Sequence, residues 1–214
     1  MKTREKIIYE ALSLFSVNGY DAVSIRRIAS AVGIKESSIY NHFKNKQDIL
    51  NKIIDETLRR YYHALESVQL PQSEDDNVAE FYNNIGDEEF LDICSKIFLF
   101  YLKDDYISKL RRLLTIEQYS NEEIGEIFRN VFIDRVLETQ RQVLQKFIDS
   151  GRFIDGDSYT MALHFYSPVF LLLYKYDNCP ESEEQAISAL KKHANQYNAI
   201  YRRNSIERGG RKNE

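Results

Sequence analysis

The chain contains few residues that interrupt helices, with 3 prolines and 8 glycines among 214 residues. It has no tryptophan and two cysteines, Cys94 and Cys179, which lie far apart and have neither a disulfide-framework nor a metal-ligand spacing. Glycine-rich phosphate loops, nucleophile elbows and internal repeats are also absent from the sequence. We therefore expect an all-α protein without a metal site or a cofactor.

Long hydrophobic runs are missing as well. The most apolar stretch, residues 161–174, contains His164, Ser167 and Pro168, and it is shorter than the ~20 residues that a membrane span needs. Residues 1–15 are charged and amphipathic, so we expect no signal peptide. These features predict a cytoplasmic protein without a membrane partner.

Charge is distributed unevenly along the chain. The whole sequence has 29 Lys and Arg against 33 Asp and Glu, a net charge of −4. Residues 1–50 hold 8 basic and 5 acidic residues, a balance of +3, which leaves a balance of −7 for the remainder. The N-terminal end is therefore the part of the chain suited to a polyanionic partner.

Residues 24–43, SIRRIASAVGIKESSIYNHF, predict two short helices around a tight turn. Gly33 stands at the turn, where a positive φ is needed that glycine adopts without steric cost. Ser24 can cap the first helix, and residues 35–42 are long enough for about two turns of a second helix. The second helix is rich in hydrogen-bonding side chains, which suit base edges and phosphates. An ordinary helical hairpin with a polar face is the alternative that these residues alone leave open.

The flanking residues carry a family resemblance. The motifs are ALSLFSVNGYDAVSI at the exit of the first helix, then IASAVGI, then SSIYNHFKNKQDIL. Over residues 5–55 the chain resembles the DNA-binding domain of the tetracycline-repressor (TetR) family of bacterial regulators. Val32, Lys35 and Ser37 depart from the usual family pattern, which leaves the capping of the second helix and its base preference open.

The expected organisation is an all-α fold with an N-terminal three-helix, helix-turn-helix domain followed by a helical ligand-binding and dimerisation domain, about nine to ten helices in total. We place the helix-turn-helix domain at 1–46, the effector-binding and dimerisation domain at 47–203 and a disordered tail at 204–214. Hydrophobic periodicity predicts later helices near 78–84, 87–103, 105–118, 121–150, 157–176 and 182–201, after an acidic loop at 70–77.

Side-chain chemistry and the family pattern together nominate two sets of DNA contacts. Phosphate contacts are expected from Ser24, Arg26, Tyr40, His42 and Lys46. Base-edge contacts are expected from Lys35, Glu36, Ser37, Ser38 and Asn41. The alternative for each of them is a solvated surface side chain.

The resemblance also implies an effector pocket and a dimer formed by the last two helices. Aromatic walls with polar handles would suit a planar or cationic organic effector, and the candidates are Tyr61, His63, Phe98, Tyr101, Gln118, Tyr119, Phe132, Gln140, His164 and Phe165. The candidates for the dimer interface are Tyr159, Phe170, Tyr174, Ile187, Leu190, Ala194 and Tyr197. The alternatives are aromatic core residues and a fully buried central helix in a monomer.

The sequence therefore predicts a homodimeric transcriptional repressor that leaves a palindromic double-stranded DNA operator when an unknown small organic effector binds. One alternative is a TetR-like protein that acts without a small ligand, as an activator or as a DNA-bound interaction protein. A more distant alternative is an enzyme on a helical scaffold. Because no catalytic spacing is visible in the sequence, we expect no enzymatic activity.

Overall fold

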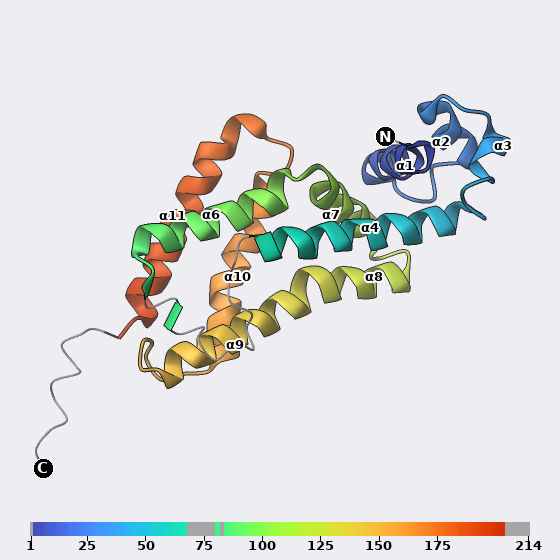
Figure 1. The fold of residues 1–214 in the computed structure, drawn as a ribbon. Helices are drawn as coiled ribbons and strands as arrows, with labels where there is room; N and C mark the ends of the chain where they lie inside the picture. The colour runs from blue at the N-terminus through green and yellow to red at the C-terminus, as the bar shows by residue number, and fades with distance from the viewer. Residues whose placement is uncertain (1, 68–79, 82–83, 204–214) are drawn as a thin grey trace, which may run out of the picture. The chain divides into compact units, whose positions relative to one another are not determined.

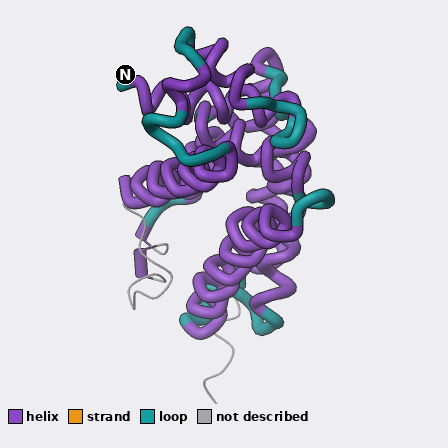
Figure 2. Tube along the Cα trace, turned by 90° about the vertical axis from the view of Figure 1, so that its right-hand side faces the viewer, coloured by secondary structure: helices purple, strands orange, loops and turns teal. Residues whose placement is uncertain are grey.

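The computed structural model describes residues 2–67, 80–81 and 84–203. Apart from one isolated β-bridge between Phe153 and Arg202, regular secondary structure in these residues is helical (Figures 1 and 2). The all-α class predicted from the scarcity of proline and glycine is confirmed.

Helices account for most of the described residues. They are α1 (Thr3–Asn18), α2 (Ile25–Val32), α3 (Glu36–Ile39), α4 (Lys46–Ser67), α6 (Asp87–Lys103), α7 (Asp105–Glu117), α8 (Glu122–Arg129), the π-helix η1 (Asn130–Asp134), α9 (Arg135–Asp149), α10 (Ser158–Lys175), the 3₁₀-helix η2 (Pro180–Ser182) and α11 (Glu183–Tyr201). The helices predicted near 87–103, 105–118, 157–176 and 182–201 are confirmed within a residue or two at each end.

The single helix predicted at 121–150 is divided into two α-helices by a π-helical segment. α8 ends at Arg129 and α9 begins at Arg135, with η1 between them. A π-helix has wider hydrogen-bonded turns than an α-helix, so the side-chain register shifts at this point. Hydrophobic periodicity predicted the helix correctly and did not indicate the change of helix type.

Packing divides the chain into two compact units, which we describe separately. The first unit comprises Met1–Val68 and Lys103–Phe132, and the second comprises Gln69–Leu102 and Ile133–Glu214. In the first unit α7 packs on α1 and α4, so this unit includes more than the three N-terminal helices. The functional boundary after residue 46 stays a prediction.

The core of the first unit is formed by one apolar face of α1 against its neighbours. The apolar side chains of α1 that are at most 4% exposed are Ile7, Ile8, Ala11, Leu12 and Phe15. They recur at helical spacing and pack with α2, α4 and α7. Burial of this stripe makes α1 the centre of the unit.

The core of the second unit lies between α9, α10 and α11. Its buried cluster consists of Leu137, Leu144, Phe147, Phe153, Met161, Ala162, Tyr166 and Tyr197. Asp157 begins α10 by accepting a hydrogen bond of 2.7 Å from the Thr160 N–H. This unit is therefore a helical layer with an aromatic-rich interior.

The second helix of the motif is shorter than predicted. α3 has four residues, Glu36–Ile39, so the expectation of about two turns over 35–42 is wrong. Lysine has no acceptor oxygen, and Lys35 therefore makes no side-chain cap at the start of α3. At the other end the N–H groups of His42 and Phe43 both donate to the Ile39 carbonyl, at 2.9 and 3.0 Å, which closes the helix in a turn.

Three predictions fall on parts of the chain that the structure does not describe. The acidic loop at 70–77 and the tail at 204–214 lie outside the described residues. Most of the helix predicted near 78–84 lies outside them as well.

Candidate nucleic-acid interface

α2 and α3 form a helix-turn-helix whose geometry is determined locally. The Ser24 Oγ accepts a hydrogen bond of 3.2 Å from the Arg27 N–H and caps α2. Gly33 ends α2 with φ 79° and ψ 33°, and its N–H donates to the Ala29 and Ser30 carbonyls at 3.0 and 3.1 Å. The predicted cap and the predicted left-handed turn are both confirmed.

The outward surface of this motif is polar. Ile39 is the buried residue of α3, which turns the rest of the helix outward. The predicted contacts that are exposed are Ser24, Arg26, Lys35, Glu36, Ser37, Tyr40, Asn41 and His42, while Ser38 and Lys46 are half-buried. All ten come from α2, α3, α4 or the residues that cap and join them. These side chains can reach a ligand, and their contact with DNA stays a prediction.

Tyr40 stands out among the exposed residues because it is aromatic. It caps the C-terminal end of α3 and is 54% exposed. A tyrosine hydroxyl donates to a phosphate oxygen, and its ring supplies a rigid support. The geometry therefore suits the predicted phosphate contact.

Lys46, at the start of α4, is anchored within the first unit. Its Nζ donates a hydrogen bond of 2.9 Å to the Tyr20 carbonyl and lies 4.1 Å from the centroid of the Tyr20 ring. Asn45 precedes it and caps α4 by accepting from the Asp48 N–H at 2.8 Å. The ammonium group is thus held in one place, and it keeps further N–H donors for another acceptor.

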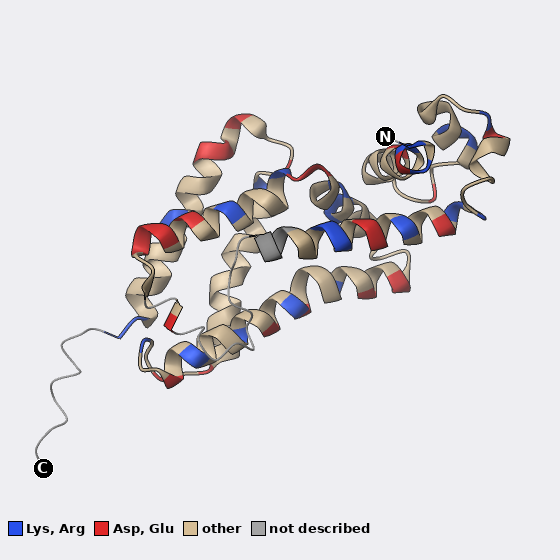
Figure 3. Cartoon of the chain, in the orientation of Figure 1, with Lys and Arg blue, Asp and Glu red and all other residues tan. Residues whose placement is uncertain are grey.

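Arg27 and Lys44 are exposed cations near the motif that were not among the predicted contacts. Arg27 neighbours Arg26 on α2, and its Nη2 donates to the Asn18 Oδ1 at 3.0 Å. Lys44 lies in the turn before α4 and is exposed. Lys and Arg residues occur on α2, at the start of α3 and around the start of α4 (Figure 3). Sequence reasoning could have identified Arg27 and Lys44 from their positions close to predicted phosphate contacts.

The ten residues predicted for an effector pocket are divided between the two units. Tyr61, His63, Gln118, Tyr119 and Phe132 belong to the first unit, and Phe98, Tyr101, Gln140, His164 and Phe165 belong to the second. Tyr119 is 91% exposed, whereas Phe98 and Phe132 are 2% and 1% exposed. The Gln140 Oε1 is buried and has no hydrogen-bond partner among the described residues. The pocket stays a prediction.

A hollow of about 240 Å³ lies in the second unit. It is lined by Asp87, Asn195, Asn198, Ala199 and Arg202, none of which was predicted as a pocket residue. Two of these lining residues form an ion pair of 2.8 Å, between Arg202 Nη1 and Asp87 Oδ1. Its lining is polar and charged, which differs from the aromatic pocket expected from the sequence.

The predicted dimer residues fall into three groups within the second unit. Tyr159 and Tyr174 on α10 are 44% and 38% exposed, and Leu171, which was not predicted, is 65% exposed. Phe170 and Ile187 are half-buried. Leu190, Ala194 and Tyr197 are at most 5% exposed and pack inside the unit. Among the predicted dimer residues, the exposed ones therefore lie on α10, and their role in a dimer stays a prediction.

The described residues lack the features of two other kinds of site. None of the helices in this part of the chain has both the length and the apolar character needed to cross a membrane. The described residues also contain no group of three or more His, Cys, Asp or Glu that could hold a metal ion. Burial raises the pKa of the Cys94 thiol to about 12, so it stays protonated at neutral pH.

Comparison with known proteins identifies the N-terminal segment. Residues 7–53 match the family model described as "Bacterial regulatory proteins, tetR family". The chain is 31% identical over 121 residues to the biofilm operon icaADBC HTH-type negative transcriptional regulator IcaR of Staphylococcus epidermidis, covering 56% of this chain and 58% of that protein. The chain thus spans little more than half the length of this curated relative.

Solved structures resemble the chain over almost its whole length. A putative TetR-family transcriptional regulator from Mesorhizobium loti is 20% identical with a TM-score of 0.67, covering 94% of this chain and 97% of that one. The SmeT–triclosan complex is 19% identical with a TM-score of 0.64, covering 96% of this chain and 94% of that one. SmeT is the repressor of a Stenotrophomonas maltophilia multidrug efflux pump. At this identity the likeness establishes the fold.

Proposed function

Because the chain belongs to the TetR family of bacterial regulatory proteins, we propose that it is a transcriptional repressor that binds a palindromic operator as a homodimer. The observation that carries the proposal is the exposed polar surface of α3, with Arg26, Lys35 and Lys46 around it. The Staphylococcus relative is a negative regulator, which favours repression over activation. The relatives are regulators, and none supports the enzyme alternative.

The contacts divide into positioning and sequence-reading groups. Arg26 and Lys46 supply cations, and Ser24 and Tyr40 supply hydroxyl donors for phosphate oxygens, which fix register without reading sequence. Lysine, asparagine and glutamate on or beside α3 suit the hydrogen-bonding edges of guanine, adenine and cytosine respectively. The residues concerned are Lys35, Asn41 and Glu36. Affinity from the first group should fall steeply with salt.

Selection of bound duplexes from a random DNA pool tests this function directly. Enrichment of a palindrome supports DNA recognition by a two-fold dimer, and its spacing gives the separation of the half-sites. Enrichment of a non-palindromic sequence supports recognition and contradicts the dimer. A pool that remains random after several rounds contradicts the proposed function.

The homodimer is proposed to form through α10 and α11. Tyr159, Leu171 and Tyr174 present apolar surface on α10 that is exposed in the single chain. An exposed apolar patch of this kind is typical of a protein interface. Two such helices from each chain would form a four-helix bundle, which is a common way to bury an apolar face.

Release by a small organic effector is the second part of the proposal. The buried, unpartnered Gln140 Oε1 would be satisfied by an amine or hydroxyl of a ligand. The complex of the similar repressor SmeT with triclosan shows that a chain of this fold can hold an aromatic compound. An effector that prefers one placement of α4 would alter the spacing of the two α3 helices and weaken DNA binding.

A thermal-shift screen with planar and cationic organic compounds tests the effector. A stabilising compound should lower DNA affinity, and DNA should weaken the compound's binding by the same factor, since linkage is reciprocal. Gln140→Ala should weaken binding of the compound and leave binding of DNA intact. A compound that binds tightly and leaves DNA affinity unaltered contradicts this mechanism for that ligand.

A repressor that acts without a small ligand is the second candidate. The hollow of about 240 Å³ in the second unit is lined largely by polar and charged groups. Ligand pockets are usually larger, from about 300 Å³ upward, and mostly apolar. This candidate would be favoured if the protein binds its operator and no compound in the screen changes its affinity for DNA.

A further inference from the structure

Tyr20 joins three helices of the first unit at the exit of α1. Its N–H donates a hydrogen bond of 2.8 Å to the Glu117 Oε1 at the C-terminal end of α7. Its carbonyl accepts a hydrogen bond of 2.9 Å from the Lys46 Nζ of α4. Its hydroxyl donates to the Gln47 Oε1 of α4 at 3.0 Å. Each polar group of Tyr20 therefore has a partner on another helix.

Glu117 is built into this position. Its side chain is 6% exposed, and its Oε2 accepts a further hydrogen bond of 3.2 Å from the Ser120 Oγ. A buried carboxylate depends on such donors because it has lost water. Gly19 has φ +81°, and a Cβ at this position would lie 2.7 Å from the Glu117 Oε1. The glycine thus permits both the backbone conformation and the close approach of the carboxylate.

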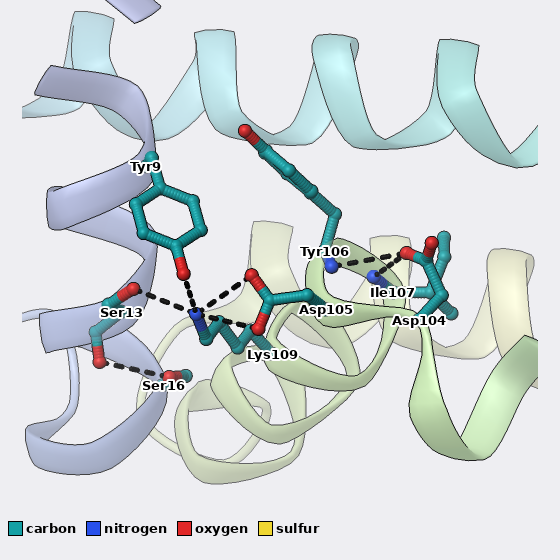
Figure 4. A network of polar contacts seen from close by, with 8 residues as sticks. All are labelled: Tyr9, Ser13, Ser16, Asp104, Asp105, Tyr106, Ile107 and Lys109. Atoms are coloured by element: carbon teal, nitrogen blue, oxygen red, sulfur yellow. Dashed lines mark hydrogen bonds and ion pairs between the residues drawn. The ribbon is translucent and has the colours of Figure 1, made fainter. Parts of the chain in front are cut away.

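The other end of α7 is also fastened to α1 (Figure 4). The Lys109 Nζ donates to the Tyr9 Oη at 3.1 Å and to the Ser13 Oγ at 3.0 Å, and it pairs with Asp105 at 2.9 Å. Burial lowers the pKa of Lys109, but the hydrogen bonds to Asp105 and Tyr9 outweigh it, and the net pKa is raised. The ammonium stays charged, and α7 is held to α1 near its start and to Tyr20, just after α1, at its end.

Lys46 connects this arrangement to the DNA interface. The Tyr20 carbonyl and ring together determine where the Lys46 ammonium lies. An ammonium group has three N–H donors, so the bond to Tyr20 leaves others for a phosphate oxygen. A change in the position of Tyr20 therefore changes the position of a predicted phosphate contact.

We propose that Glu117 is a positioning residue for DNA binding, which holds Tyr20 in place and through Tyr20 aims Lys46 at the phosphate backbone. The inference rests on the proposed function, since it concerns regulation of the same interface. A shift of the C-terminal end of α7 would then be transmitted to Lys46 through Tyr20. This route is separate from a movement along α4.

Three variants separate this role from a general charge effect. Glu117→Ala removes the acceptor, Glu117→Gln keeps an acceptor oxygen without the charge, and Glu123→Ala removes an exposed carboxylate at the start of α8 as the control. Loss of negative charge by itself favours binding to DNA. We expect Glu117→Ala to weaken binding of the selected duplex by about tenfold, the effect of one lost charge-assisted contact. Glu117→Gln and Glu123→Ala should bind like the wild type or slightly better.

Two readouts distinguish positioning from reduced folding. In Glu117→Ala the slope of log affinity against log salt should fall by about 0.9, the value for one phosphate contact, because Lys46 is no longer aimed. A smaller folded fraction would lower affinity without changing this slope. Amide hydrogen exchange in the DNA-free protein should accelerate at Tyr20 in Glu117→Ala and stay slow at the core residues Ile8 and Leu12.

A double-mutant cycle completes the test. In a Lys46→Ala background, Glu117→Ala should have little further effect on affinity, because the two residues act through the same contact. Additive losses, or wild-type affinity and salt slope in Glu117→Ala, would overturn the proposal while leaving DNA binding intact. Failure of the wild type to bind any selected duplex overturns the proposed function and this inference with it.

Discussion

Ser24 caps α2, and we propose a second role for the same hydroxyl as a phosphate contact. Its Oγ accepts the Arg27 N–H as the cap of α2, and its hydroxyl hydrogen is available for a phosphate oxygen. The first role concerns stability and the second concerns affinity for DNA. Because an aspartate can cap a helix but cannot donate to a phosphate, substitution separates them.

We expect Ser24→Ala to lower the free energy of unfolding by about 1 kcal/mol and to weaken DNA binding. Ser24→Asp should keep wild-type stability, since a carboxylate caps α2 equally well and favours its N-terminus. It should nevertheless weaken DNA binding by about tenfold or more through repulsion of phosphate. Urea unfolding and duplex titration measure the two effects. Strong DNA binding by Ser24→Asp would remove Ser24 from the phosphate contacts.

Tyr40 and Lys46 should contribute to binding of every DNA sequence. We expect Tyr40→Ala and Lys46→Ala to weaken binding to selected and random duplexes alike, because phosphate contacts carry no sequence information. Lys46→Ala should also reduce the salt slope by about 0.9. Lys96→Ala, which removes an exposed lysine of α6, is the control. Unchanged operator affinity in both interface variants would refute the assignment.

At the scale of elements, α3 lacks a side-chain cap at its start and ends earlier than predicted at its C-terminal side. Lys35 has φ −70° and ψ 147°, the backbone geometry of an N-cap, without an acceptor on its side chain. The predicted helix over 35–42 reflected the polar pattern of the segment, but the hydrogen bonds from His42 and Phe43 to Ile39 end it early. The length of a short helix depends on such end contacts more than on composition.

Lys35→Ser supplies the missing acceptor. We expect it to raise the free energy of unfolding by about 0.5–1 kcal/mol, because the serine Oγ can accept an N–H from the first turn of α3. The same change should alter base preference, since Lys35 is a predicted base contact. Chemical denaturation and repeated duplex selection measure both. Equal or lower stability of Lys35→Ser would mean that the α3 N-terminus is already satisfied by solvent.

At the scale of the whole molecule, the dimer decides whether a palindrome can be bound. We expect Leu171→Asp to yield a folded monomer, because Leu171 is 65% exposed on α10 and a buried, unpaired carboxylate would disrupt an interface. The variant should lose affinity for the palindrome and keep wild-type helical content by circular dichroism. Sedimentation at micromolar concentration measures the mass. A Leu171→Asp dimer, or a wild-type monomer, would contradict the proposed interface.

The overall charge also acts at this scale. The chain has a net charge of −4, but its first fifty residues carry a balance of +3, which favours the proposed contact with DNA. The tertiary structure shows how the cations of this segment differ. Arg26, Arg27 and Lys44 are exposed near α3, whereas Lys46 is half-buried and hydrogen-bonded to Tyr20. The charge balance could be counted from the sequence. The structure was needed to tell which of the cations are exposed and therefore available to a phosphate.

The sequence by itself determined the features that depend on neighbouring residues. The helical class, the Ser24 cap, the Gly33 turn and the family motifs rest on residues within a few positions of one another. Helical periodicity likewise predicted where α6, α7, α10 and α11 begin and end. Local hydrogen bonds and steric limits suffice for such features.

Only the tertiary structure decided which distant groups meet. Tyr20 and Glu117 lie 97 residues apart, and Tyr9 and Lys109 lie 100 residues apart, yet both pairs are hydrogen-bonded. It also decided that Leu190 and Ala194 are buried within their own unit while Leu171 is exposed. Periodicity identifies the apolar face of a helix but not the partner that covers it, because that partner depends on the packing of helices remote in sequence.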